Sequence, residues 1–126
     1  MRLYFIRHGQ SENNALYENT GSDLGRVDDP RLTSVGIRQA EATARYVSSS
    51  VDPVDRNRSG RNFGFTHLYC SPMYRAIATG KYIAEALNLP LVVLKDWHET
   101  GGIFLEDKQM GTFIHRPGLT LSLIHI

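Results

Sequence analysis

The stretch RLYFIRHGQS, residues 2–11, is the part of the sequence that most strongly indicates the fold class. It opens with an apolar run from Arg2 to Ile6 that contains aromatic and β-branched side chains, and Gly9 ends the run. Such a run is typical of a strand buried on both faces, as strands of parallel sheets are. Ser11 follows and can cap a short helix or turn. We therefore predict a buried parallel strand with polar residues directly after its end.

Helix and strand patterns alternate along the rest of the chain. Thr33 can cap a helix, whose apolar residues recur near helical spacing: Val35, Ile37, Ala40, Ala44 and Val47. Ser71 followed by Pro72 is a helix start, and this second helix is predicted to end at Asn88. The remaining predicted segments are strands over residues 65–70 and 91–94 and loops over residues 17–32 and 51–64. This order predicts a parallel sheet under helices.

Composition narrows the class of protein. The 126 residues are 41% apolar and 21% charged, which is ordinary for a globular domain. A net charge of +1 argues against a nucleic-acid-binding or membrane-surface protein, which normally carries a basic excess. Cys70 is the only cysteine, so neither an internal disulfide nor a thiolate metal cage is expected. No apolar stretch approaches membrane-spanning length, and we predict a cytoplasmic protein.

Arg7, His8 and Gly9 come directly after the first predicted strand, where open α/β sheets place their ligand crevice. Arginine presents a planar fork of donors that matches phosphate oxygens. Neutral imidazole is a competent nucleophile toward phosphorus, and adjacent cations favour an anionic substrate. Glycine permits a close backbone approach that a side chain would prevent. These residue types suit attack on a phosphate ester, although three residues are a weak pattern and a single histidine is more often a surface or core residue.

Arg75 lies in the segment CSPMYRA, residues 70–76, within the first turn of the second predicted helix. That helix follows a predicted parallel strand, so its start should lie at the same sheet edge as His8. Backbone amides at a helix start favour an anion. Without the Arg7-His8-Gly9 motif, an exposed helical residue would be the first interpretation of Arg75, but the two motifs together predict an anion site.

In these motifs the sequence resembles the histidine phosphatase superfamily, in its phosphoglycerate-mutase-like branch, over residues 2 to about 118. The resemblance is carried, in order, by RHGQSENN, DDPRLTSVGIRQA, CSPMYRAIATG and the glutamate in DWHETGG. It implies an α/β fold, a three-layer α/β/α domain with a mainly parallel sheet. We expect residues 1–118 to be the N-terminal part of one such domain and residues 119–126 to be a non-native tail.

The resemblance also implies roles for individual residues. His8 matches the residue that becomes phosphohistidine, and Arg7 and Arg75 match the arginines that hold the transferred phosphoryl group. Glu99 matches the carboxylate that protonates the leaving oxygen and later helps to activate water. A further set matches positions at the substrate pocket: Gly9, Ser11 and Asn14.

The chain departs from the family pattern at its C-terminal end. The family places a second catalytic histidine in a His-Gly step after a late strand. His115 lies in a predicted loop, and His125 is followed by isoleucine, so neither matches that step. We therefore expect the 126 residues alone to have little activity.

The leading prediction is a phosphatase, an enzyme that hydrolyses small phosphate monoesters through phosphohistidine at His8, without a metal or other cofactor.

A phosphoglycerate mutase is the second interpretation. It is disfavoured because GQSENN, after the Arg-His-Gly step, lacks the tryptophan of glycolytic mutases, and WHETGGI, around the acid, lacks their Asn-Glu-Arg-x-Tyr-Gly run. A pseudoenzyme or inactive fragment that binds phosphate is the third. A dinucleotide-binding domain fits poorly, because a single glycine, Gly9, follows the first strand. The sequence does not predict the particular ester or the oligomeric state.

Overall fold

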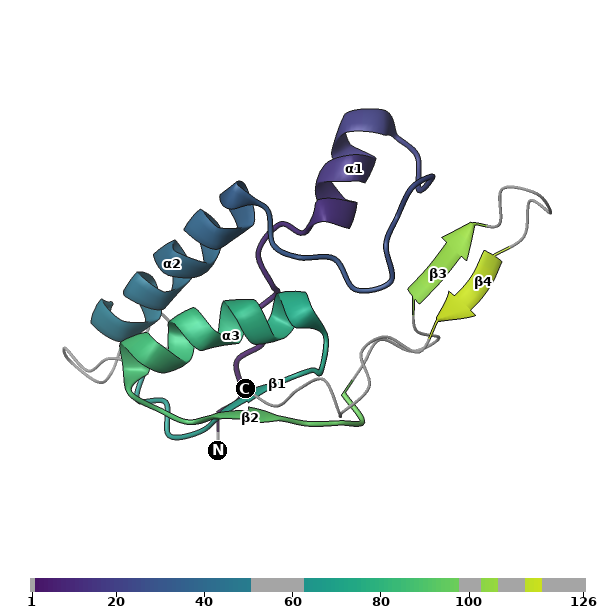
Figure 1. The fold of residues 1–126 in the computed structure, drawn as a ribbon. Helices are drawn as coiled ribbons and strands as arrows, with labels where there is room; N and C mark the ends of the chain where they lie inside the picture. Colours follow the sequence, from purple (N-terminus) through teal and green to yellow (C-terminus); the bar gives the residue numbers. More distant parts are fainter. Residues whose placement is uncertain (1, 51–62, 98–102, 107–112, 117–126) are drawn as a thin grey trace.

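The computed structural model describes residues 2–50, 63–97, 103–106 and 113–116. In Figure 1 two helices come first along the chain, a strand–helix–strand unit follows, and a pair of short strands comes last. In chain order the elements are α1 (Glu12–Thr20), α2 (Ser34–Ser49), β1 (Leu68–Cys70), α3 (Tyr74–Leu87), β2 (Leu91–Val93), β3 (Ile103–Glu106) and β4 (Phe113–Arg116).

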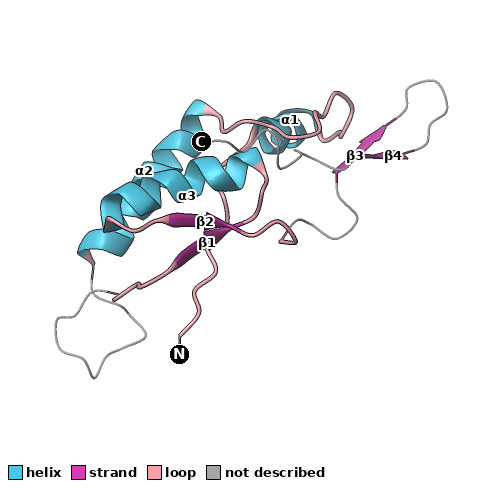
Figure 2. Cartoon of the chain, turned by 60° about the horizontal axis from the view of Figure 1, so that its bottom comes forward, coloured by secondary structure: helices cyan, strands magenta, loops and turns pink. Residues whose placement is uncertain are grey.

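Two parallel strands joined through α3 confirm the predicted strand–helix–strand unit. β1 pairs with β2 in parallel, with Leu68 opposite Leu91 and Cys70 opposite Val93. Helix α3 packs on both strands and α2 packs on α3, so these helices lie on one face of the pair (Figure 2). Of the three predicted layers, the described residues show this sheet layer and the helices on this one face.

The strand predicted over residues 2–6 is not present in the structure, so this prediction is wrong. Residues 2–10 have no strand ladder, and the side chains of Leu3 and Phe5 are 70% and 87% exposed. A strand needs a neighbouring backbone for its hydrogen bonds, and aromatic contacts hold this segment instead. The ring of Tyr4 meets the rings of Phe63 and Phe65 edge to face, with centroids 5.5 and 5.1 Å away.

Helix α1 confirms the predicted cap at Ser11. The hydroxyl of Ser11 accepts the backbone N–H of Asn14, and the Asn14 side chain accepts the backbone N–H of Ser11, which forms a capping box. The helix runs on to Thr20, further than predicted, and ends at Gly21 with a left-handed backbone. The loop predicted from residue 17 therefore begins at Gly21.

Helix α2 begins as predicted, because the Thr33 hydroxyl accepts the backbone N–H of Gly36. Ala40, Ala44 and Val47 are buried, but Val35 is 38% exposed. The core where α2 meets α3 is built from Ala44, Val47 and Ile83, with partly buried neighbours Phe63, Phe65, Leu68, Tyr82 and Leu87.

Helix α3 begins later than Ser71 and Pro72 predict. Its first residue is Tyr74, and the preceding Met73 supplies no side-chain cap. The helix ends as predicted at Asn88, which adopts the left-handed backbone that asparagine tolerates. None of the helices in the described ranges is both long and apolar enough to cross a membrane.

Strands β3 and β4 pair antiparallel, with Phe104 opposite His115. His115 therefore lies in a strand, which corrects the loop predicted for it.

The backbone of residues 9 and 10 lies directly against the first turn of α2. A Cβ atom on Gly36 would meet the carbonyl group of Gln10, and one on Gly9 would meet the carbonyl of Gly36. Gln10 also accepts the backbone N–H of Thr33 at 3.0 Å and donates its own N–H to the Gln39 side chain at 2.7 Å. The absence of side chains at Gly9 and Gly36 is what allows this contact.

Replacing Gly36 by alanine tests this contact. We expect Gly36→Ala to lower the free energy of unfolding by about 2–4 kcal/mol, because the new methyl group would push two backbones apart. The measurement is urea unfolding followed by circular dichroism. Gly21→Ala is the control, since Gly21 has a left-handed φ of 66° but open space around its Cβ position. Gly21→Ala should lower the free energy of unfolding by only about 1–2 kcal/mol. Equal losses in both variants would contradict the close contact.

Candidate active site

His8 lies where the N-terminal segment meets the start of α3. Its Nδ1 is 2.7 Å from the carbonyl oxygen of Gly9, and its Nε2 is 3.0 Å from Nε of Arg75. A carbonyl can only accept and a guanidinium N–H can only donate. The two contacts therefore define a neutral ring with the proton on Nδ1 and the lone pair on Nε2. This is the tautomer in which Nε2 is the nucleophile.

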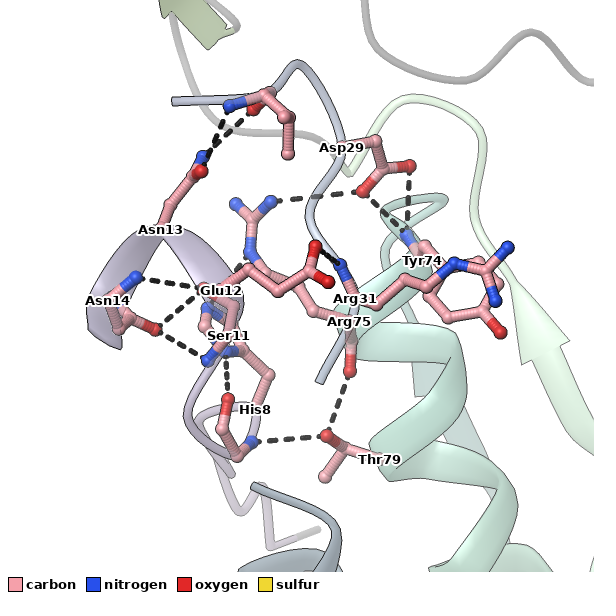
Figure 3. A network of polar contacts seen from close by, with 12 residues as sticks. His8, Ser11, Glu12, Asn13, Asn14, Asp29, Arg31, Tyr74, Arg75 and Thr79 are labelled. Carbon is pink, nitrogen blue, oxygen red and sulfur yellow. Dashed lines mark hydrogen bonds and ion pairs between the residues drawn. The ribbon is translucent and has the colours of Figure 1, made fainter. Parts of the chain in front are cut away.

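Arg75 reaches His8 from the first turn of α3, as the sequence predicted. Its side chain is 8% exposed, and Nη1 lies 3.9 Å from a carboxylate oxygen of Asp29. Figure 3 shows the guanidinium between His8 and Asp29. A buried arginine beside an imidazole lone pair creates a cationic point that suits an anionic ligand.

Thr79 joins the backbone of the His8 segment to α3, and sequence reasoning missed it. Its hydroxyl accepts the backbone N–H of Gly9 at 3.1 Å and donates to the carbonyl oxygen of Arg75 at 2.8 Å (Figure 3). The residue is 4% exposed. The available signal was spacing, because residues four apart share one face of a helix and Thr79 follows Arg75 at that distance.

Asp29 is the second residue that sequence reasoning missed, since it stands in a segment predicted as plain loop. Both of its carboxylate oxygens lie 3.0 Å from the backbone nitrogen of Tyr74. Burial raises the pKa of the Asp29 carboxyl above its usual range, while the Tyr74 N–H and the charge of Arg75 act in the opposite direction. No local sequence pattern indicated this contact with a helix 45 residues away.

Ser11 and Asn14, predicted at the substrate pocket, form the capping box of α1. Ser11 is 2% exposed, and its hydroxyl donates to Oδ1 of Asn14 at 2.9 Å. Their neighbour Asn13 holds the following loop, with its side-chain amide bonded to both backbone groups of Val27. In the described structure these polar groups hold the helix start, and a substrate contact at Ser11 or Asn14 stays a prediction.

Arg7 is exposed, unlike Arg75. It borders a cavity of about 1330 Å³ that is also lined by His8, Cys70, Ser71 and Thr79. The structure thus brings His8, Gly9 and Arg75 together and leaves the Arg7 side chain at the edge of the cavity. Glu99, the predicted general acid, lies outside the described residues. Within the described ranges, no three His, Cys, Asp or Glu side chains are grouped so that they could hold a metal ion.

The chain belongs to the histidine phosphatase superfamily, branch 1, whose family model matches residues 3–112. This membership and the strand–helix–strand unit establish a partial phosphoglycerate-mutase-like α/β fold.

Among curated relatives, a "probable phosphoglycerate mutase" of Yersinia pestis (strain Pestoides F) is 34% identical over 92 residues, which are 73% of this chain and 34% of that protein. A protein of the same name from Yersinia pseudotuberculosis serotype O:1b (strain IP 31758) matches equally. The chain thus matches about a third of the length of these relatives.

Two solved structures are similar to the chain. Phosphoserine phosphatase from Entamoeba histolytica, in complex with 3-phosphoglyceric acid, is 28% identical with a TM-score of 0.49, over 72% of this chain and 36% of that one. A mycobacterial glucosyl-3-phosphoglycerate phosphatase is 20% identical with a TM-score of 0.49, over 84% of this chain and 40% of that one.

Removing the Thr79 hydroxyl tests how the His8 segment is attached to α3. We expect Thr79→Val to lower the free energy of unfolding by about 1–3 kcal/mol, because the buried N–H of Gly9 loses its acceptor. Thr43→Val is the matched control, since the Thr43 hydroxyl also donates to the carbonyl four residues earlier, but in an exposed hydrogen bond of a half-buried residue. That control should change stability by less than about 0.5 kcal/mol. Urea unfolding of both variants gives the comparison, and similar losses would argue against the Gly9 contact.

The single thiol at the cavity offers a second test. Burial raises the pKa of the Cys70 thiol from 9.0 to about 11. At pH 8 the reactive thiolate is then about a hundredfold scarcer than for a thiol with the ordinary pKa. We expect slow modification by an aromatic disulfide reagent, with a rate that rises toward pH 11. The same chain in urea is the control, and equal rates at pH 8 in the folded and unfolded states would show an accessible thiol.

Proposed function

We propose that this chain carries the phosphoryl-accepting part of a phosphatase that hydrolyses small phosphate monoesters through a phosphohistidine at His8. The observation that carries the proposal is the hydrogen bond between Nε of Arg75 and Nε2 of His8, at 3.0 Å. It places a permanent cation next to the lone pair of a neutral imidazole. Membership of the superfamily supports the same chemistry at its general level.

In the proposed first step, a phosphate oxygen takes over the Nε–H donor of Arg75 and so releases the lone pair of His8. Nε2 then attacks phosphorus, the P–O bond to the leaving group breaks, and the leaving oxygen takes a proton from Glu99. In the second step the Glu99 carboxylate takes a proton from water as the water oxygen attacks phosphorus, the P–N bond breaks, its electron pair returns to Nε2 of His8, and inorganic phosphate leaves. Arg7 and Arg75 stabilise the charge on the equatorial oxygens in both steps.

The proposal assigns the remaining predicted residues as well. Gly9 is assigned to the phosphate site, and Ser11 and Asn14 are assigned to the pocket for the rest of the substrate. No metal or other cofactor takes part. A cytoplasmic location, expected from the sequence, is part of the same proposal.

Phosphoglycerate mutase activity is the second candidate, because the Yersinia relatives carry that name. The two activities share phosphohistidine formation and differ in its fate. In a mutase the phosphoryl group passes to a hydroxyl group of a glycerate, whereas in a phosphatase it passes to water. A phosphate-binding protein without turnover is the third candidate and would stop before the first step.

The first experiment measures hydrolysis of p-nitrophenyl phosphate in chelator by the natural protein that carries this sequence, beside His8→Ala. We expect His8→Ala to lower kcat by about a thousandfold or more, because the nucleophile itself is removed. His67→Ala is the control, since His67 is an exposed histidine bonded to the neighbouring Thr66. It should keep its activity.

A companion assay follows 3-phosphoglycerate. Release of inorganic phosphate supports the phosphatase, whereas conversion into 2-phosphoglycerate supports the mutase. Turnover that survives His8→Ala would exclude His8 as the nucleophile, and absent turnover with intact phosphate binding would favour the binding protein.

A further inference from the structure

Asp29 ties the loop between α1 and α2 to the start of α3. Its side chain is 9% exposed, and both oxygens accept the backbone N–H of Tyr74 at 3.0 Å (Figure 3). Tyr74 is the first residue of α3, and Met73 before it supplies no side-chain cap. A carboxylate from a distant loop therefore satisfies a helix-start amide that the local sequence leaves unpaired.

The same carboxylate faces the guanidinium of Arg75. Nη1 of Arg75 lies 3.9 Å from Oδ1 of Asp29, while Nε of the same group donates to Nε2 of His8 at 3.0 Å. Because the guanidinium is planar and rigid, the hydrogen bond at Nε and the longer ion pair at Nη1 act on the same rigid group. Both contacts favour the orientation in which Arg75 faces His8.

Stability alone does not account for an ionised group at this position. Burial raises the pKa of Asp29 above the value in the unfolded chain. The folded state therefore favours the neutral form of Asp29. The contribution of that form to the free energy of unfolding is lost as the pH rises through the raised pKa. At neutral pH the charge of Asp29 therefore opposes folding, and asparagine should be tolerated there.

We propose that Asp29 is a positioning residue of the phosphate site, whose carboxylate fixes the Arg75 guanidinium so that its Nε–H faces Nε2 of His8 and any phosphate oxygen that arrives there. The role at phosphate rests on the proposed function. The ion pair between Asp29 and Arg75 is present in the unliganded protein, so its effect on Arg75 can be tested separately.

Asp29→Asn is the test variant, because the amide oxygen can still accept the Tyr74 N–H while the charge toward Arg75 is lost. Asp23→Asn is the matched control, since it removes the same charge from a side chain that is 42% exposed and paired with Arg26. The first readout is the NMR signal of the Arg75 Nε–H group in the absence of ligand. We expect a distinct, slowly exchanging signal in the unaltered protein and in Asp23→Asn, and its loss by exchange in Asp29→Asn.

The second readout is binding of inorganic phosphate, followed by the NMR shifts of the His8 ring. We expect Asp29→Asn to bind phosphate about tenfold more weakly, with no loss of thermal stability at pH 7. A purely electrostatic role predicts the opposite sign, because removing a negative charge near Arg75 would strengthen anion binding. Unchanged or tighter phosphate binding, together with an unchanged Arg75 signal, would overturn the proposal.

These readouts separate the two proposals. If phosphate fails to bind the unaltered protein, the proposed function fails, and the Arg75 signal still decides whether Asp29 holds Arg75. If phosphate binds and Asp29→Asn changes neither readout, the positioning role fails and the proposed function stands.

A second variant keeps the test open if Asp29→Asn does not fold. Tyr74→Pro removes the N–H that Asp29 accepts but leaves its charge beside Arg75. Proline is favoured at the first position of a helix, and Met73, at φ −73° and ψ 135°, already has the backbone of a residue before proline. We expect Tyr74→Pro to retain the Arg75 signal with less than about a threefold change in phosphate affinity. Loss of that signal would overturn the proposal, because it would show that the contact with the Tyr74 N–H, and not the carboxylate charge, orients Arg75.

Discussion

The backbone amides of Gly9 and Gln10 each donate to a side chain from a different helix, and the position of His8 depends on these two bonds. Gly9 donates to Thr79 of α3, and Gln10 donates to Gln39 of α2. A segment without a strand ladder is thereby fixed in space. The close backbone contact at Gly36 adds a steric constraint to the two hydrogen bonds. His8 is consequently carried by the packing of α2 on α3, which also positions Arg75.

The polar network around Arg75 differs in kind from the apolar core between α2 and α3. The core contacts of Ala44, Val47 and Ile83 are non-directional and contribute stability through the area that they bury. The contacts of Arg75 with His8 and Asp29 fix directions, and burying such charges brings little net stability. The same two helices thus provide a stabilising interface along their length and an oriented cation at one end of α3.

Much of the fold could be predicted from local signals. The caps at Ser11 and Thr33 and the end of α3 at Asn88 follow from side-chain chemistry within a few residues, and the structure confirms them. The prediction of a strand over residues 2–6 was wrong because an apolar composition indicates that a segment can be buried. It does not show that a neighbouring backbone is present to pair with it. The predicted start of α3 was wrong because the backbone N–H of Tyr74 is satisfied by Asp29, which is remote in sequence.

The candidate site could be predicted in part for the same reason. His8 and Arg75 were expected at one sheet edge, and the structure places them in hydrogen-bonding contact. Thr79 and Asp29 were missed because their partners come from other elements, and only tertiary structure shows which loop meets which helix. Glu99 lies outside the described residues, so its role stays a prediction.

The two hydrogen bonds of the His8 ring have very different ranges along the chain. The bond from Nδ1 reaches the carbonyl of the next residue, while the bond at Nε2 comes from Arg75, 67 residues away. Local backbone geometry therefore selects which nitrogen carries the proton, and tertiary structure alone supplies the cation. Removing the Arg75 guanidinium would therefore take away the cation and leave the local contact at Nδ1 in place. Reactivity of the atom and recognition of its target thus depend on different parts of the chain.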